Sequence, residues 1–140
     1  MKTFFGTAHP WLCDIMGHLN TRSYAAMFDD ACAQYLAALG SIPIDVAENR
    51  IGWAHVRGEI EYRAEILLGE SVTIDSATEC VGTKSLTMFS EMRGTASGVL
   101  HATIRSTLVR FDLEKRRSNS ISDEIRNAAN ALVKTKPCEN

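Results

Sequence analysis

The hydrophobic pattern of the first third of this 140-residue chain predicts a short strand followed by one long helix. Residues 3–8 form a short strand-like stretch, which His9 and Pro10 end because proline lacks an amide donor and restricts the residue before it. From Thr21, apolar residues recur every three or four positions and predict a helix that stops before Gly40. The apolar face of this helix comprises Tyr24, Met27, Phe28, Ala31, Tyr35, Leu36 and Leu39.

The period changes to two after a linker at residues 41–51. Residues 53–66, "WAHVRGEIEYRAEI", alternate between a charged set and an apolar set, which predicts a long antiparallel strand with one buried face. The apolar set comprises Ala54, Val56, Gly58, Ile60, Tyr62, Ala64 and Ile66.

Three further strands are predicted near residues 71–81, 84–93 and 99–113. Gly69 and Glu70 separate the first of them from the preceding strand, and the loop 94–98 lies between the last two. Gly82-Thr83 suits a two-residue hairpin turn with glycine first. The polar stretch "EKRRSNS" then leads to an amphipathic helix at residues 122–133.

This order of elements predicts an α+β fold in a single domain over residues 1–140. Consecutive hairpins form an antiparallel sheet, and the long helix must cover the apolar face of that sheet. A curved sheet wrapped around one central helix satisfies both requirements. Such a sheet leaves an edge strand exposed, which invites pairing with a second copy of the chain.

Composition narrows the classes of partner. The net charge of -2 and the absence of a long basic run argue against nucleic acid, although residues 115–117 form a small basic cluster. There is no apolar stretch of membrane-spanning length. The four cysteines are irregularly spaced, so we expect free thiols in a reduced, cytoplasmic protein.

The stretch "CDIMGHLN", residues 13–20, concentrates the residues with chemical potential. Asn20 stands where a helix N-cap belongs, and Gly17 allows an unusual backbone angle or a close approach to a ligand. Asp14 is either a loop acid in an Asx-turn or a catalytic carboxylate. Cys13 is an alternative nucleophile with His9 or His18 as its base, and a zinc site formed by these three residues lacks a fourth ligand at a familiar spacing.

The longer segment "WLCDIMGHLNTRSYAAMFDDA" resembles the D-x-x-G-H-x-N-x-x-x-Y signature of the hot-dog fold acyl-CoA thioesterases, in the 4-hydroxybenzoyl-CoA thioesterase-like group. "HVRGEIEYRAEILLGESVTI" resembles the same group's pattern of a tyrosine-bearing strand, an apolar-Gly-acid turn and another strand. The resemblance covers nearly the whole chain. It implies a hot-dog fold, in which a curved antiparallel sheet wraps one long central helix and a short helix follows at the C-terminus.

The resemblance also implies an activity, which is hydrolysis of an acyl-CoA thioester to the free acid and coenzyme A. Asp14 would be the general base or the nucleophile, and backbone amides near Asn20 and Thr21 would hold the thioester oxygen. Members of the family are homodimers or homotetramers with sites at subunit interfaces. No metal and no redox cofactor is implied, since coenzyme A is part of the substrate, and the acyl group does not transfer with the motif.

The residues themselves fit this chemistry. The free amides and positive dipole end of a helix N-terminus form an oxyanion hole when they face a carbonyl. His18 can hydrogen-bond Asp14, orient water or contact the acyl group, and Tyr24 is either a core residue or a pocket wall. Asp29 lies on the solvated side of the helix, and Asp30 is a second candidate base because another branch of the fold uses a mid-helix carboxylate.

Coenzyme A carries phosphates, so its site needs arginine or lysine side chains. The candidates are Arg22, Arg63, Lys84, Arg93, Arg116 and Arg117, among which we select Arg63, Lys84, Arg116 and Arg117. With Gly17 and Tyr24 they form the predicted substrate-binding set. Two other functions stay open, namely a non-catalytic hot-dog subunit that binds an acyl thioester and a hot-dog dehydratase.

Overall fold

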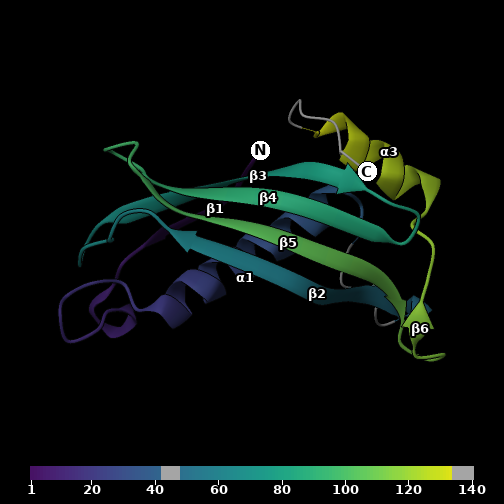
Figure 1. Cartoon of the computed structure of the whole chain (residues 1–140), viewed down its shortest axis with the longest axis horizontal. Coiled ribbons are helices and arrows are strands. Elements are labelled where there is room, and N and C mark those ends of the chain that lie inside the picture. The colour runs from purple at the N-terminus through teal and green to yellow at the C-terminus, as the bar shows by residue number, and fades with distance from the viewer. Residues whose placement is uncertain (42–47, 134–140) are drawn as a thin grey trace. The chain divides into compact units, whose positions relative to one another are not determined.

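The computed structural model describes residues 1–41 and 48–133 of the chain. The elements in chain order are β1 (Lys2–Thr7), a 3-10 helix (Pro10–Leu12), α1 (Thr21–Ala38), β2 (Ile51–Tyr62), β3 (Ser71–Val81), β4 (Ser85–Gly94), β5 (Leu100–Asp112), β6 (Arg117–Ser118) and α3 (Asp123–Ala131). Figure 1 labels the strands, α1 and α3. Each predicted strand and helix is present, and the two-residue strand β6 is additional. Residues 42–47 of the predicted linker lie outside the described residues.

The described strands form one six-stranded sheet in the order β1-β3-β4-β5-β2, with β6 paired to β5. The pairs β1–β3 and β5–β6 are antiparallel, and the predicted antiparallel sheet is confirmed. The strands β1 and β2 therefore lie at the two ends of the order and have the free edges.

The chain forms two compact units, and the first comprises Met1–Gln34, Ile60–Ser76 and Ser90–Ile104. Four residues of the predicted apolar face of α1, namely Tyr24, Met27, Phe28 and Ala31, are buried in the core of this unit. That core comprises Ala8, Leu19, Tyr24, Met27, Phe28, Ala31, Ile66, Val72, Ile74, Met92 and Ala102. Because burial of one large apolar side chain contributes about 1.5–3 kcal/mol, these contacts account for the position of α1 in the unit.

The second unit comprises Tyr35–Glu59, Ala77–Phe89 and Arg105–Asn140. Its core includes the fully buried Tyr35, whose hydroxyl lies 2.6 Å from Thr78 Oγ1. Helix α3 begins after Ser122, whose hydroxyl accepts a hydrogen bond from the Ile125 amide. No helix in the described part of the chain is long and apolar enough to cross a membrane.

Strand β2 differs from its prediction in extent and in burial. It ends at Tyr62 rather than at residue 66, because the amides of Arg63 and Ala64 both donate to the His101 carbonyl and the chain leaves the strand path there. The predicted buried face is also partly wrong, since Val56 is 60% and Tyr62 51% exposed. These side chains lie on an edge strand, so a neighbouring strand covers β2 on one side only.

Two smaller expectations are also wrong. The β3–β4 turn is in the predicted place, but Gly82 lacks the positive φ that a glycine-first turn requires. Cys13 and Cys32 carry thiols, whereas Cys80 is disulfide-bonded. Spacing along the chain does not reveal which thiols the fold brings together. Burial raises the pKa of the Cys32 thiol to about 12, so this thiol stays protonated near neutral pH.

We predict that the chain is a dimer or tetramer in solution and that the 12-residue edge strand β2 is the contact. Light scattering at micromolar concentration should give a multiple of the 15.4 kDa chain mass. Val56→Lys places a charge on this edge and should lower the measured mass. Phe5→Lys is the matched control on the other edge, β1, and should leave the mass unchanged. A wild-type mass near 15.4 kDa would contradict the prediction.

Candidate functional site

The motif loop folds back on itself before α1 begins. The Asp14 amide donates to the His18 carbonyl at 2.8 Å, and the Asn20 amide donates to the Leu12 carbonyl at 2.9 Å. Gly17 closes the turn with φ of +80°, a backbone angle that other residues adopt at a cost. The motif therefore forms a compact hairpin, with Asp14 opposite His18.

One carboxylate oxygen of Asp14 holds the tip of this hairpin. Asp14 Oδ1 accepts hydrogen bonds from the Met16 amide at 2.8 Å and from the His18 amide at 3.2 Å. This is the Asx-turn of the structural interpretation. The other oxygen, Oδ2, makes no hydrogen bond within residues 1–41 and 48–133. The carboxylate is therefore fixed through Oδ1. Because the side chain is only half-buried, Oδ2 can contact a ligand.

A second segment, residues 63–70, pairs with the other side of the loop. The Leu19 amide donates to the Ile66 carbonyl at 2.8 Å, and the Leu68 amide donates to the Gly17 carbonyl at 3.0 Å. The His18 ring lies against this segment, with Nε2 at 3.2 Å from Glu65 Oε2. His18 thus contacts Asp14 through its backbone amide, while its ring pairs with a different acid.

The predicted N-cap of α1 is confirmed. Asn20 Oδ1 accepts a hydrogen bond from the Arg22 amide at 3.1 Å, and the Asn20 carbonyl accepts from the Ser23 and Tyr24 amides. The amide of Asn20 itself is bound to the Leu12 carbonyl, so it cannot serve as an oxyanion donor in this conformation. Of the amides expected near Asn20 and Thr21, the Thr21 N–H alone makes no hydrogen bond in the described residues.

Of two further predicted site residues, Tyr24 is buried and Arg63 is exposed. Tyr24 is 4% exposed and lies in the core of the first unit, with its ring edge-on to Tyr62. Burial raises the pKa of its hydroxyl, and a hydrogen bond with the Ile66 backbone opposes that rise. Arg63 is exposed and pairs with Glu61. The core interpretation of Tyr24 therefore fits better than that of a pocket wall.

The other predicted phosphate-binding residues belong to the second unit. Lys84 and Arg117 line one polar pocket of about 350 Å³, in which Lys84 Nζ lies 3.4 Å from Ser118 Oγ. Arg116 does not line this pocket, and its guanidinium lies over the Phe111 ring at 5.2 Å. The structure thus brings Lys84 and Arg117 together, while Arg116 contacts an aromatic ring outside their pocket.

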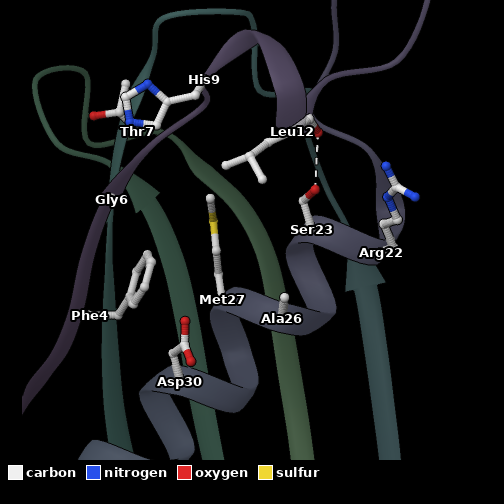
Figure 2. Close-up of a pocket in the computed structure, with 10 residues that line it drawn as sticks. All are labelled: Phe4, Gly6, Thr7, His9, Leu12, Arg22, Ser23, Ala26, Met27 and Asp30. Atoms are coloured by element: carbon white, nitrogen blue, oxygen red, sulfur yellow. Dashed lines mark hydrogen bonds between the residues drawn. The ribbon is translucent and has the colours of Figure 1, made fainter.

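A larger, mostly apolar pocket of about 460 Å³ lies beside the first half of α1 (Figure 2). Figure 2 shows the Met27 side chain in its middle, with Arg22 and Asp30 at opposite ends. The lining residues are Phe4, Gly6, Thr7, His9, Leu12, Arg22, Ser23, Ala26, Met27 and Asp30. Asp30 is thus the carboxylate that lines this pocket, whereas Asp14 is not among its lining residues.

The alternative chemistries of the motif find little support. Cys13 Sγ lies 3.9 Å from the Ala8 carbonyl, and the imidazoles of His9 and His18 contact Trp11 and Glu65 instead of this sulfur. No group of three His, Cys, Asp or Glu side chains in residues 1–41 and 48–133 is arranged to hold a metal ion.

Sequence reasoning missed three residues of this region, Glu65, Glu70 and His101. Glu65 pairs with His18, and Glu70 Oε1 lies 2.9 Å from Nε2 of the buried His101. Glu65 is one of the charged positions in the alternating stretch 53–66, and His101 is one polar residue within a long strand. Neither pattern carries a signal for a contact between distant segments.

The sequence matches the model of the thioesterase-like superfamily over residues 8–129. The chain therefore belongs to this superfamily. This membership confirms the predicted family and the predicted enzyme class, acyl-CoA thioesterase. No curated protein matches the chain at the level of sequence.

Solved structures share the fold. The hypothetical protein SAV2348 from Staphylococcus aureus, determined in complex with CoA, superposes with a TM-score of 0.89 at 16% identity and covers 100% of this chain and 89% of its own. A predicted thioesterase from Bacillus stearothermophilus has a TM-score of 0.80 at 25% identity, and the match covers 95% of this chain and 98% of the thioesterase. The 1,4-dihydroxy-2-naphthoyl-CoA thioesterase Slr0204 from Synechocystis has a TM-score of 0.81 at 14% identity, and the match covers 92% of this chain and 95% of Slr0204. The hot-dog fold is confirmed.

We predict that Asn20→Ala lowers the free energy of unfolding by about 1 kcal/mol, because the Arg22 amide loses its acceptor. Urea denaturation followed by circular dichroism measures the change. Ser122→Ala removes the corresponding cap of α3 and is the matched control, with a loss of similar size and no effect on hydrolysis. An Asn20→Ala protein as stable as wild type would show that the cap does not stabilise α1.

Proposed function

We propose that this chain hydrolyses an acyl-CoA thioester to the free acid and coenzyme A at the motif loop. Asp14 is the general base or the nucleophile, and the Thr21 amide is the oxyanion donor. One observation carries the proposal. The loop fixes Asp14 through Oδ1, while Asp14 Oδ2 and the Thr21 N–H stand without hydrogen bonds in the described residues. The superfamily match and the CoA complex of a structural neighbour support the substrate class.

In the general-base route, Asp14 Oδ2 takes a proton from water as the water oxygen attacks the thioester carbon. The carbonyl oxygen gains negative charge, which the Thr21 N–H and the positive end of α1 stabilise. The carbon–sulfur bond then breaks, and the coenzyme A thiolate takes up the proton. In the nucleophile route, Oδ2 attacks the carbonyl carbon and expels the thiolate, and water hydrolyses the resulting anhydride.

The proposal gives His18 and Asn20 supporting roles. His18 supplies a backbone amide to Asp14 Oδ1, and the contact of its ring with Glu65 keeps this part of the loop in place. Asn20 sets the first turn of α1, so the Thr21 amide is next to the cap. In this account the substrate phosphates contact basic side chains, with Arg63, Lys84 and Arg117 as candidates, and the active enzyme is a homodimer or homotetramer with sites at subunit interfaces.

We predict that Asp14→Asn slows hydrolysis by about 10²- to 10⁴-fold. The asparagine Oδ1 can still accept from the Met16 and His18 amides, so the hairpin is retained. Free thiol released from a panel of acyl-CoAs gives the rate. Titration with a non-hydrolysable acyl-CoA thioether gives the affinity, which should change little.

Asp30→Asn is the matched control, because Asp30 is exposed and lines the pocket beside α1. It should keep the wild-type rate. An Asp14→Asn enzyme of near wild-type rate beside an inactive Asp30→Asn enzyme would move the base to the middle of α1. Wild-type protein that binds the thioether but releases no thiol would be the non-catalytic subunit, and loss of water from a 3-hydroxyacyl-CoA would identify a dehydratase.

A further inference from the structure

His101 is a buried titratable side chain that the proposed reaction does not use. It lies on β5 with an exposure of 3%, and its Nε2 is 2.9 Å from Glu70 Oε1. Its other ring nitrogen, Nδ1, is buried without a hydrogen-bond partner in the described residues. An apolar side chain would fill this position without an unsatisfied polar atom. The histidine is therefore best explained by its contact with Glu70.

The pair holds the segment 63–70 from one side. The His101 carbonyl accepts hydrogen bonds from the Arg63 amide at 2.7 Å and the Ala64 amide at 3.1 Å. Glu70 Oε2 accepts from the Leu67 amide at 3.3 Å. The His101 carbonyl thus binds the beginning of the segment, Glu70 binds its middle, and the His101 ring contacts its last residue, Glu70.

The same segment holds the motif loop from its other side. The Ile66 carbonyl accepts from the Leu19 amide, and the Leu68 amide donates to the Gly17 carbonyl. Gly17 and Leu19 flank His18, whose amide binds Asp14 Oδ1. Hydrogen bonds and the short backbone stretches between them therefore connect the His101–Glu70 pair, through residues 63–70, to the carboxylate of Asp14.

Gly94 leaves the space that the pair occupies. A Cβ atom at this position would lie 2.9 Å from Glu70 Oε1 and 3.1 Å from His101 Nε2. These distances are shorter than ordinary van der Waals contacts, so a side chain here would push against both partners. Because Gly94 has no side chain, the buried His101 and Glu70 can meet beside β4.

We propose that Glu70 and His101 are positioning residues that hold the Asp14 loop through segment 63–70. This inference rests on the proposed function, since it takes Asp14 as the residue whose position matters. With the proton on Nε2, His101 donates to the Glu70 carboxylate, and the unpartnered Nδ1 is a lone pair rather than a buried N–H. Neither side chain touches the substrate.

Glu70 is the residue to replace, because its side chain is 27% exposed and that of His101 only 4%. Glu70→Ala should lower kcat by about 10- to 100-fold, because a small displacement of a catalytic group has effects of this size. KM should change less. Glu70→Gln keeps an acceptor for His101 Nε2 and should therefore have most of the wild-type rate. His101→Gln should behave in the same way, because its side-chain amide can donate to Glu70. Asp75→Asn, which removes a surface ion pair with Lys2, is the matched control and should leave the rate unchanged.

A double mutant separates positioning from general loss of stability. In an Asp14→Asn background, Glu70→Ala should cost less than about twofold, because the positioned carboxylate is already gone. Hydrogen exchange should also quicken in Glu70→Ala at the amides of Met16, His18 and Leu19, and stay unchanged in Asp75→Asn. Equal losses from Glu70→Ala in both backgrounds, or unchanged exchange at these amides, would overturn the inference. If Asp14→Asn alone left the rate unchanged, the proposed function would fail, and the exchange data would still judge the link from Glu70 to the loop.

Discussion

The backbone pairing of residues 17–19 with residues 66–68 is the constraint on which the proposed site depends. It fixes one side of the motif hairpin, and the Leu12–Asn20 pair fixes the other. With both sides held, Asn20 can act only as the cap of α1, and the first turn of the helix has a defined place. The apolar contacts of Tyr24, Met27 and Phe28 then hold that turn on the core.

Asp14 combines a structural and a chemical role because a carboxylate has two oxygens. Hydrogen bonds from two loop amides fix Oδ1, so the Asp14 side chain cannot rotate freely. This fixation orients Oδ2 without using it. The same principle applies at the helix N-terminus, where three of the first four amides are satisfied by Asn20 and the Thr21 amide is left. A carboxylate oxygen and an N–H donor are the two groups that thioester hydrolysis requires.

The sequence predicted the elements well because their periods are strong. Seven apolar positions marked the face of α1, and turn residues marked the ends of β3, β4 and β5. It failed where tertiary contacts decide. The end of β2 depends on the His101 carbonyl, which captures two amides, and the exposure of Val56 depends on the place of β2 in the sheet. The disulfide at Cys80 could not be read from spacing.

For the candidate site too, the sequence predicted the local features but not the contacts between distant segments. The motif predicted that Asp14, Gly17 and Asn20 share the loop before α1, with Asn20 as the helix cap, because these residues act through local turns and caps. That this loop is a hairpin emerged only from the structure. The partner of His18 was not predictable, since Glu65 is distant in sequence and the alternation of its strand suggested only a solvated position. The choice between the Asn20 and Thr21 amides likewise required the Leu12–Asn20 hydrogen bond.

A crystal structure with an acyl-CoA ketone, in which a methylene replaces the thioester sulfur, tests the central claim most directly. The carbonyl is retained and cannot be hydrolysed, so the ligand reports where the reacting group lies. We expect the ketone oxygen about 2.7–3.1 Å from the Thr21 nitrogen, with Asp14 Oδ2 facing the carbonyl carbon. A ketone oxygen without contact to Thr21, or a carbonyl beside Asp30 in the pocket along α1, would contradict it.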